Sequence, residues 1–375
     1  MKLKAKGKLS EHFDEIEDPR IERTKRHKLI DILTIAILAV ICGADSWVGM
    51  ESFGQAKQTW LSRILELPNG IPSHDTFARV FARVNPEQFQ ACFLSWVRSL
   101  VRLSDGEVVA IDGKTLRQSY NRADDKAAIH MVSAWASANR LVLGQRKVDA
   151  KSNEITAIPQ LIKLLELDGC IVTIDAMGCQ KQIATQIIER NADYVLALKD
   201  NQGNLFADVQ QIFAHAQSCN FAGIEHSFNQ TVDKGHGRVE IRRCWTMAQV
   251  EFLVDADQWQ KFTSIGMIQA ERRLPGKVEQ ETRYYISSLA SDAARLSQAV
   301  RTHWLVENAL HWVLDLAFVE DACRVRKDFA PENLAVVRHI ALNLLSQETS
   351  LNLGVKNKRL RAGWDEDYLL KIFFG

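Results

Sequence analysis

The pattern of apolar positions divides the chain into a helical part and a part rich in strands. In the first hundred residues apolar side chains recur every three or four positions, as in Phe77, Val80, Phe81 and Val84. This spacing puts them on one face of a helix, and Ser73 is a suitable cap for the helix that follows it. The pattern predicts several short helices, which suit either a helix-turn-helix DNA-binding module or a plain helical subdomain.

From residue 107 the spacing changes to that of strands. Three β-rich segments with short connections read VVAID, HMVSAWASA and LVLGQRKVD, which predicts an antiparallel meander. A helical segment follows, and after it come a strand CIVTID, a helix QKQIATQIIERN and a strand DYVLALKDN. Because strands that alternate with helices are joined by right-handed crossovers, we expect these later strands to run parallel.

The segment from about residue 222 to 290 differs again. Its first part, DKGHGRVEIRRCWTM, has a Gly-His-Gly turn followed by alternation, and FTSIGMIQAERR and VEQETRYYISSL flank LPGK as the arms of a hairpin would. This pattern predicts a β-rich insertion. The stretch SDAARLSQAVRTHWLVENALHWVLDLAF then contains no Gly or Pro, which predicts a return to helix.

Composition narrows the range of locations and partners. The 375 residues are 46% hydrophobic and 25% charged, as in an ordinary globular protein, and the net charge of +1 requires any nucleic-acid surface to come from local clusters. The seven cysteines form no CxxC pair, which suits a reducing cytoplasm. The most apolar run, residues 29–42, is too short to cross a bilayer, so we expect a cytoplasmic protein that does not contact membranes.

Two aspartates occupy matching places in the strand pattern. Asp112 and Asp175 follow the apolar runs VVAI and IVTI, each at the carboxyl end of a predicted strand. If these strands are neighbours, both carboxylates lie at one edge of the sheet, where α/β proteins collect ligands. Such a pair suits Mg²⁺ or Mn²⁺, which prefer oxygen ligands. The alternative for either residue alone is that one aspartate caps a helix and the other forms a turn.

The long predicted helix carries four further candidates at intervals of four residues. They are His303, Glu307, His311 and Asp315. This spacing stacks them on one helical face, where one of them can supply the third acid of a divalent metal site. The stripe is equally typical of the solvated side of an amphipathic helix. A zinc site of histidine and carboxylate ligands is a further alternative, weakened by the lack of a second such helix.

Cations and amides lie near these acids and in separate clusters. Lys114 lies two residues after Asp112, and Lys199 and Asn201 end the strand YVLALK. A lysine beside carboxylates holds a phosphate or forms a salt bridge, and the sequence leaves both open. The basic clusters are candidates for phosphate contacts, or are ordinary solvated surface. The DNA-binding candidates in them are Arg20, Arg23, Lys25, Arg26, Arg242, Arg243, Lys358 and Arg359.

Six motifs in a fixed order resemble those of the H-repeat-associated DDE transposases of bacterial insertion sequences. They are IDGKTLRQS, KSNEITAIPQLI, TIDAMGCQ, VLALKDNQ, KGHGRVEIRR and HWLVENALHWVLDLAFVED. The resemblance covers nearly the whole chain, because RHKLIDILTIAILAVICG and IPSHDTFARVFARV precede these motifs in the same way. Several motifs in one order are far more specific than any single acidic residue.

The resemblance implies an α/β fold with an RNase H-like catalytic core, in which helices flank a mixed five-stranded sheet. It assigns residues 1–100 to an N-terminal helical domain that binds DNA. Residues 101–214 and 294–375 then form the catalytic core, and residues 215–293 form the β-rich insertion.

The resemblance also implies a chemistry. Asp112, Asp175 and Glu307 take the places of the acidic triad, which binds two Mg²⁺ or Mn²⁺ ions and catalyses phosphoryl transfer. The enzyme would cut double-stranded DNA at the ends of its element and join those ends to a target, as a homodimer. Two alternatives stay open: a transposase-derived protein that binds DNA without cutting it, and an RNase H-like nuclease or resolvase.

One motif departs from the pattern of related transposases. Many of those with such an insertion carry Tyr, Arg and Lys at fixed distances from the catalytic glutamate, and here these places hold Val300, His303 and Leu314. The phosphate contacts of that motif therefore do not carry over, and Arg301 or His303 is the expected substitute. The fallbacks for Glu307 are Asp315, Glu320 and Asp321.

Overall fold

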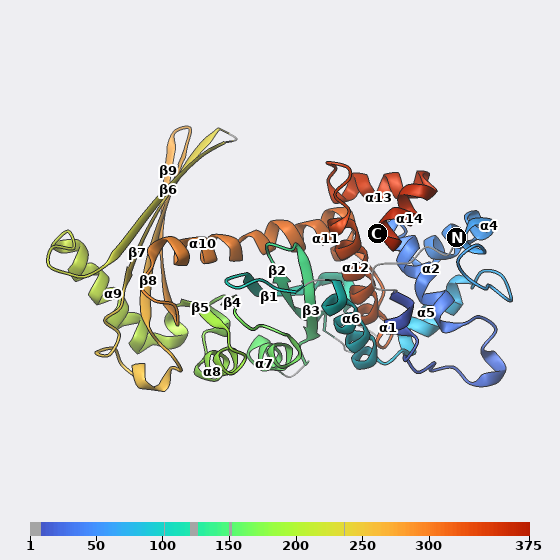
Figure 1. Ribbon diagram of the computed structural model, residues 1–375, viewed down its shortest axis with the longest axis horizontal. Helices are drawn as coiled ribbons and strands as arrows, with labels where there is room; N and C mark the ends of the chain where they lie inside the picture. The colour runs from blue at the N-terminus through green and yellow to red at the C-terminus, as the bar shows by residue number, and fades with distance from the viewer. Residues whose placement is uncertain (1–8, 101, 121–126, 150–151, 236) are drawn as a thin grey trace.

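The computed structural model describes residues 9–100, 102–120, 127–149, 152–235 and 237–375. The molecule is elongated, with helices from both ends of the chain at one extremity and long β-hairpins at the other (Figure 1). Between them lies a sheet with helices on both faces. Among the described residues, no helix combines the length and apolarity needed to cross a membrane.

The N-terminal part is helical, as its apolar spacing predicts. Its helices are α1 (Leu9–Phe13), α2 (Leu29–Ile41), α3 (Trp47–Ala56), α4 (Gln58–Leu61), α5 (His74–Arg83) and α6 (Pro86–Leu100). Helix α2 is buried along nearly its whole length, which explains its almost continuous apolar sequence. Ser73 does occupy the N-cap position of α5, but its hydroxyl lies 3.2 Å from that of Thr76 and bonds no backbone N–H.

The central sheet begins with the predicted meander. Strands β1 (Val108–Leu116), β2 (Ile129–Ala136) and β3 (Leu141–Lys147) are antiparallel, while β4 (Ile171–Ile174) and β5 (Asp193–Leu198) run parallel to β1. Helices α7 (Glu154–Leu164) and α8 (Lys181–Glu189) make the crossovers. The order β3-β2-β1-β4-β5 and these directions are those of an RNase H-like core, which confirms the predicted fold class.

The β-rich segment does not form a separate layer. After α9 (Gly203–Ser218) come β6 (Ser227–Gly235), β7 (Arg238–Met247), β8 (Ser264–Leu274) and β9 (Lys277–Ser287), and β8 and β9 form the predicted hairpin. Strand β9 pairs with β5, so the five strands of the core continue into one sheet of nine. This pairing covers the edge of β5, which would otherwise present unpaired backbone groups.

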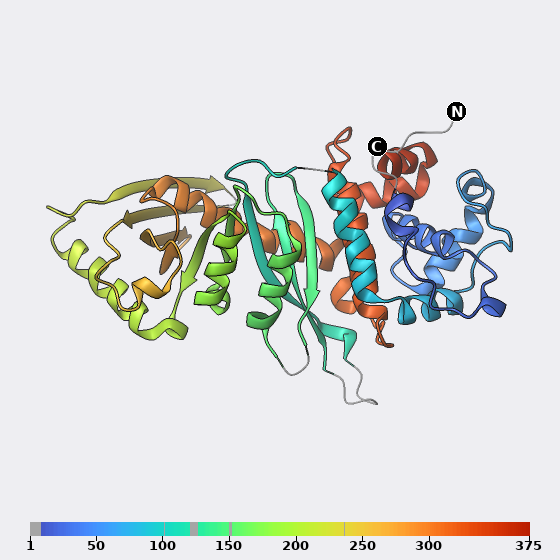
Figure 2. The same ribbon diagram turned by 60° about the horizontal axis from the view of Figure 1, so that its bottom comes forward.

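A helical run crosses the opposite face of the sheet from α7 and α8 (Figures 1 and 2). It consists of α10 (Ala293–His303), the π-helical turn η6 (Glu307–His311) and α11 (Trp312–Ala317). Helices α12 (Ala330–Gln347), α13 (Val355–Trp364) and α14 (Glu366–Phe374) complete the chain.

Helix α12 ties the sheet to the N-terminal helices. Its Asn343 side chain accepts a hydrogen bond from the backbone N–H of Val142 in β3 and donates one to the carbonyl of the same residue, at 2.8 and 2.9 Å. Its Asn333 donates to the carbonyls of Phe81 and Val84, at the end of α5, at 2.8 and 2.9 Å. Since both amides are fully buried, these bonds fix the N-terminal helices against the sheet.

The domain boundaries at residues 100, 214 and 293 stay predictions.

Candidate active site

The two matching aspartates stand next to each other in the sheet. Parallel pairing of β1 with β4 ends at Ile111 and Ile174, and Asp112 and Asp175 are the next residues on the two strands. The expectation that Asp112 ends its strand is wrong, because β1 continues to Leu116 against β2. The carboxylates still lie where the parallel strands part, which is the usual place for ligands in such sheets.

Asp175 is held by the turn that follows it. Its Oδ1 accepts hydrogen bonds from the backbone N–H groups of Met177 and Gly178, at 3.1 and 3.4 Å, and so caps the short 3₁₀ turn Ala176–Gly178. Asn201, after β5, supports this turn by donating to the carbonyl of Ala176 at 2.7 Å. The capping alternative is thus true of Asp175, yet it uses one carboxylate oxygen and leaves the other for a ligand.

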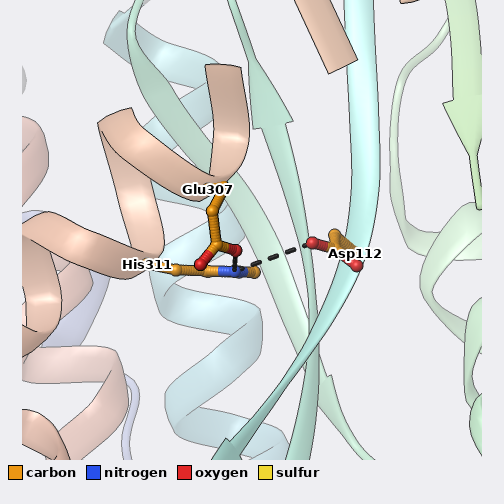
Figure 3. A group of neighbouring side chains, drawn as sticks. All are labelled: Asp112, Glu307 and His311. Atoms are coloured by element: carbon orange, nitrogen blue, oxygen red, sulfur yellow. Dashed lines mark hydrogen bonds and ion pairs between the residues drawn. The ribbon is translucent and has the colours of Figure 1, made fainter. Parts of the chain in front are cut away.

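Asp112 meets two residues of the π-helical turn. The Nδ1 atom of His311 lies 3.6 Å from Oδ2 of Asp112 and 3.2 Å from Oε2 of Glu307 (Figure 3). One ligand atom from each of the three side chains falls within 4.8 Å of the others, and Asp175 lies outside this group. The π-helical turn widens the helix at this point, a distortion found often at functional sites. The Glu307 side chain is 65% exposed and that of His311 only 6%, so the glutamate can be reached from solvent.

The environment disfavours negative charge on both aspartates. Burial raises the pKa of Asp112 to about 6, and the charges of Asp175 and Glu154 add to the rise, against the lowering effects of His311 and the Gly113 N–H. Burial and Glu154 also raise the pKa of Asp175, and Lys199 opposes this. Acids that are costly to ionise when alone are the kind that a bound cation stabilises.

Glu154 is a residue that the sequence reasoning missed. It lies at the start of α7 on the other side of β1, where its Oε1 is 2.5 Å from Nε2 of His130. A Cβ atom on Gly113 would lie 2.1 Å from the same oxygen, so a larger residue there would displace the Glu154 carboxylate from its present position. The sequence signal that could have identified Glu154 is the motif KSNEITAIPQLI, in which Glu154 is the one acidic residue.

Three of the four residues in the stripe on the long helix are turned towards the sheet, and Glu307 is the exposed one. His303 and His311 are buried, and Asp315 bonds Lys114 of β1. The Nδ1 atom of His303 lies 3.0 Å from the Thr173 hydroxyl of β4, and burial lowers the pKa of His303 to about 4, which keeps it neutral. His303 therefore does not replace the missing arginine as a cation. Arg301 is exposed and pairs with Asp233 of the insertion at 2.7 Å.

Lys114 forms ion pairs with three carboxylates. Its ammonium group bonds Asp315, lies 2.8 Å from Glu320 and lies 3.7 Å from Asp321. Glu320 in turn lies 3.5 Å from the buried guanidinium of Arg338. Lys114 thus balances charge and is not free to hold a phosphate. The same contacts engage the three fallback acids, which are not part of the group formed by Asp112, Glu307 and His311.

A cavity of about 400 Å³ adjoins the other side of Asp175. It lies between β5, β9 and α10, and its lining includes Lys199, Arg283, His303 and Trp304. The guanidinium of Arg283 stacks over the half-exposed ring of Trp304, 4.1 Å from its centroid. Lys199 is exposed and stays a candidate for contact with the substrate.

Three of the DNA-binding candidates are structural. Arg359 is buried, donates to the carbonyl of Val40 in α2 and pairs with Asp45 at 2.8 Å. Lys358 is buried and donates to the carbonyls at the end of α12. Arg20 is held by Asp18 at 2.6 Å. The prediction that Lys358 and Arg359 contact DNA is wrong, because docking of α13 on α2 and α12 encloses both side chains.

The other candidates lie on the surface. Lys25 pairs with Glu22 at 2.5 Å, while Arg242 pairs with Asp233 and Glu240 and Arg243 with Glu271. Arg23 and Arg26 are exposed. DNA contact by these five residues stays a prediction.

Comparison with known proteins decides the family. The domain described as Transposase DDE domain matches residues 103–344, and the one described as DDE_Tnp_1-associated matches residues 10–97. The chain belongs to the DDE transposase family.

The chain is similar to two curated relatives over nearly its whole length. This DDE transposase is 40% identical to the protein named "H repeat-associated putative transposase YhhI" and also 40% identical to YbfL, both of Escherichia coli (strain K12), over 98% of each chain. A piggyBac transposase synaptic complex with hairpin DNA aligns with 98% of this chain and 76% of that chain, at 10% identity and a TM-score of 0.42. The family assignment rests on the sequence matches.

Proposed function

We propose that this DDE transposase cuts DNA at the ends of a bacterial insertion sequence and joins those ends to target DNA by metal-dependent phosphoryl transfer. The observation that supports this most is the convergence of Asp112, from β1, with Glu307 and His311, from a helix far along the chain. Asp175 stands beside Asp112 at the end of the neighbouring strand. The proposed substrate is double-stranded DNA, and the homodimer stays a prediction.

The side chains fit a divalent cation. Asp112, Asp175 and Glu307 offer the carboxylate oxygens that Mg²⁺ and Mn²⁺ prefer. Burial already makes the charge on Asp112 costly, and Nε2 of His311 is buried without a partner among the described residues. When bound, two such ions supply the positive charge that activates a hydroxyl group and stabilises the leaving oxygen.

The chain itself orients these acids. His311 holds Glu307 and Asp112 at one place, because its Nδ1 faces both carboxylates. The backbone N–H groups of Met177 and Gly178 fix the rotamer of Asp175. Lys114 keeps α11 against β1 two residues from Asp112, which sets the distance between strand and helix. A site held from several sides in this way is already arranged before the substrate arrives.

Divalent ions are expected to stabilise the folded protein, in a way that depends on pH. At a concentration of 100 times Kd the gain in unfolding free energy is about 2.7 kcal/mol. The gain shrinks as pH falls through about 6, because protons then compete for Asp112. Thermal unfolding with and without Mn²⁺, at about pH 7.5 and about pH 5, measures this.

The variant Asp175→Asn provides the control for that measurement. It is expected to remove most of the Mn²⁺ effect, whereas Asp257→Asn, at an exposed site in the 3₁₀ turn Ala256–Gln258, is expected to retain it. An Mn²⁺ effect of equal size in both variants would show that the ion binds elsewhere.

The proposed activity is tested by comparing DNA substrates. Purified protein with Mg²⁺ is incubated with duplexes that carry the ends of its own element, with four-way junctions and with RNA–DNA hybrids. We expect cleavage at the element ends and none in the Asp175→Asn variant. Preferred cleavage of junctions or hybrids would instead indicate a resolvase or an RNase H-like nuclease, and binding without any cleavage would indicate an inactive relative.

A further inference from the structure

Four exposed cations on two separate segments have no carboxylate within 4.0 Å in the part of the chain that the structure describes. They are Arg79 and Arg83 of α5 and Arg324 and Lys327 of the segment before α12. Other cations near the sheet are engaged by acids: Lys114 contacts three carboxylates, and Arg146 pairs with Glu87. Unpaired cations that face solvent retain their full charge for a partner.

The two segments touch each other. The backbone N–H of Phe329 lies 3.3 Å from the carbonyl of Ala82, the residue before Arg83. Asn333, one turn into α12, binds the carbonyls of Phe81 and Val84 on either side. The end of α5 and the start of α12 therefore form one rigid corner at the junction of the N-terminal helices and the sheet (Figure 2).

The same corner is connected to the candidate active site. Arg326 donates to the carbonyl of Gln118 at 2.8 Å and stacks over Tyr120 at 4.6 Å, just beyond the end of β1. Arg117 binds Asp321 at 3.2 Å, and Asp321 lies beside Lys114. These contacts connect the part of β1 beyond Asp112 to the segment before α12, and through that segment to α5.

The arrangement on α5 has the form of a phosphate-binding face. Its buried residues are Phe77, Val80, Phe81 and Ala82, which leaves Arg79 and Arg83 one turn apart on the solvent side. Asp75, Glu87 and Asp328 are the exposed acids nearest in sequence. Glu87 pairs with Arg146, so the four cations outnumber the other two acids by two. A surplus of exposed positive charge that leads away from a phosphoryl-transfer site suits the backbone of a DNA duplex.

We propose that Arg79, Arg83, Arg324 and Lys327 form a basic track that binds the phosphates of duplex DNA on one side of the bond to be cut. The choice of DNA as the ligand of this track rests on the proposed function. It adds a sequence-independent contact that joins the N-terminal helices to the catalytic core on one DNA molecule. These residues replace the buried Lys358 and Arg359 as the DNA-contacting cations of this end of the molecule.

The test measures how DNA binding depends on salt. A fluorescent duplex of arbitrary sequence is titrated with protein at about 50 to 200 mM salt without divalent ions. The variants are Arg83→Gln with Lys327→Gln, and Arg79→Gln with Arg324→Gln. The matched control is Lys163→Gln with Arg190→Gln, which removes the same charge from exposed sites at α7 and α8, on the other face of the sheet.

Each track variant is expected to make the negative slope of log K against log salt shallower by about 1.8, because two phosphate contacts are lost at about 0.9 each. The control variant is expected to keep the wild-type slope. Equal slopes for track and control variants, or no binding by the wild-type protein, would overturn the proposal. All four side chains are exposed, so thermal unfolding of the variants should match that of the wild type.

The result is separable from the proposed function. Reduced slopes in a protein that never cuts element-end DNA would uphold the track and contradict the transposase activity. Cleavage of element ends together with unchanged slopes would uphold the activity and remove the track.

Discussion

Replacement of Asp112 by asparagine is expected to abolish DNA cleavage and, at the same time, to make the folded protein more stable at neutral pH. The loss of cleavage should be on the order of 10³-fold or more, as for other residues that act directly in catalysis. Asparagine keeps the shape of the side chain and the bond to the Gly113 N–H, so the fold should not change.

The gain in stability follows from the pKa of Asp112. The folded chain raises this pKa from 3.8 to about 6, so the native state binds the proton more tightly than the unfolded state does. The free energy of unfolding therefore falls as pH rises from about 4 to about 6, by about 3 kcal/mol for two pKa units. Asparagine never ionises, so the variant should lose this pH dependence.

Urea unfolding without divalent ions, at about pH 4 and about pH 7.5, measures the effect. Asp257→Asn is the matched control, since its side chain is exposed and should change stability by less than about 0.5 kcal/mol. A variant Asp112→Asn that cleaves at the wild-type rate would exclude Asp112 from the chemistry, whatever its stability.

The third acid is tested by changing Glu307 and Glu320 separately. Glu307→Gln should abolish cleavage with little change in stability, because its side chain is 65% exposed. Glu320→Gln should cost about 3 to 5 kcal/mol of unfolding free energy, because it leaves Lys114 and Arg338 as buried cations that have lost a partner.

Urea unfolding and cleavage by the folded fraction separate these two roles. Asp321→Asn is the milder control for Glu320→Gln, since Asp321 is partly exposed and lies 3.7 Å from Lys114. Wild-type cleavage by Glu307→Gln, combined with loss of cleavage in Asp315→Asn, would move the third acid to Asp315.

Local patterns in the sequence were sufficient to predict the strands of the core. Strand-like apolar segments predicted the meander and the β8–β9 hairpin, and the matched runs before Asp112 and Asp175 predicted that these residues lie at one edge of the sheet if the strands are neighbours. These features depend on neighbours along the chain or on the general rule that parallel strands share an edge. The pairing of β9 with β5 has no such local signal, because it joins segments separated by the whole insertion.

Side-chain partners far along the chain could not be read from the sequence. Lys114 binds acids some two hundred residues away, and Arg359 binds α2 near the opposite terminus. The same limit applies to the site itself. Four-residue spacing put Glu307 and His311 on one face, but only the path of α10, η6 and α11 across the sheet brings that face to Asp112.

The most direct test of the central claim is a joining assay. Labelled duplexes with the ends of the element are incubated with circular target DNA and Mg²⁺, using wild-type protein, Asp112→Asn and the Asp257→Asn control. We predict joined products with the wild type and the control, none with Asp112→Asn, and none when Mg²⁺ is chelated. Bound but uncut DNA with the wild type, or joined products with Asp112→Asn, would contradict the account.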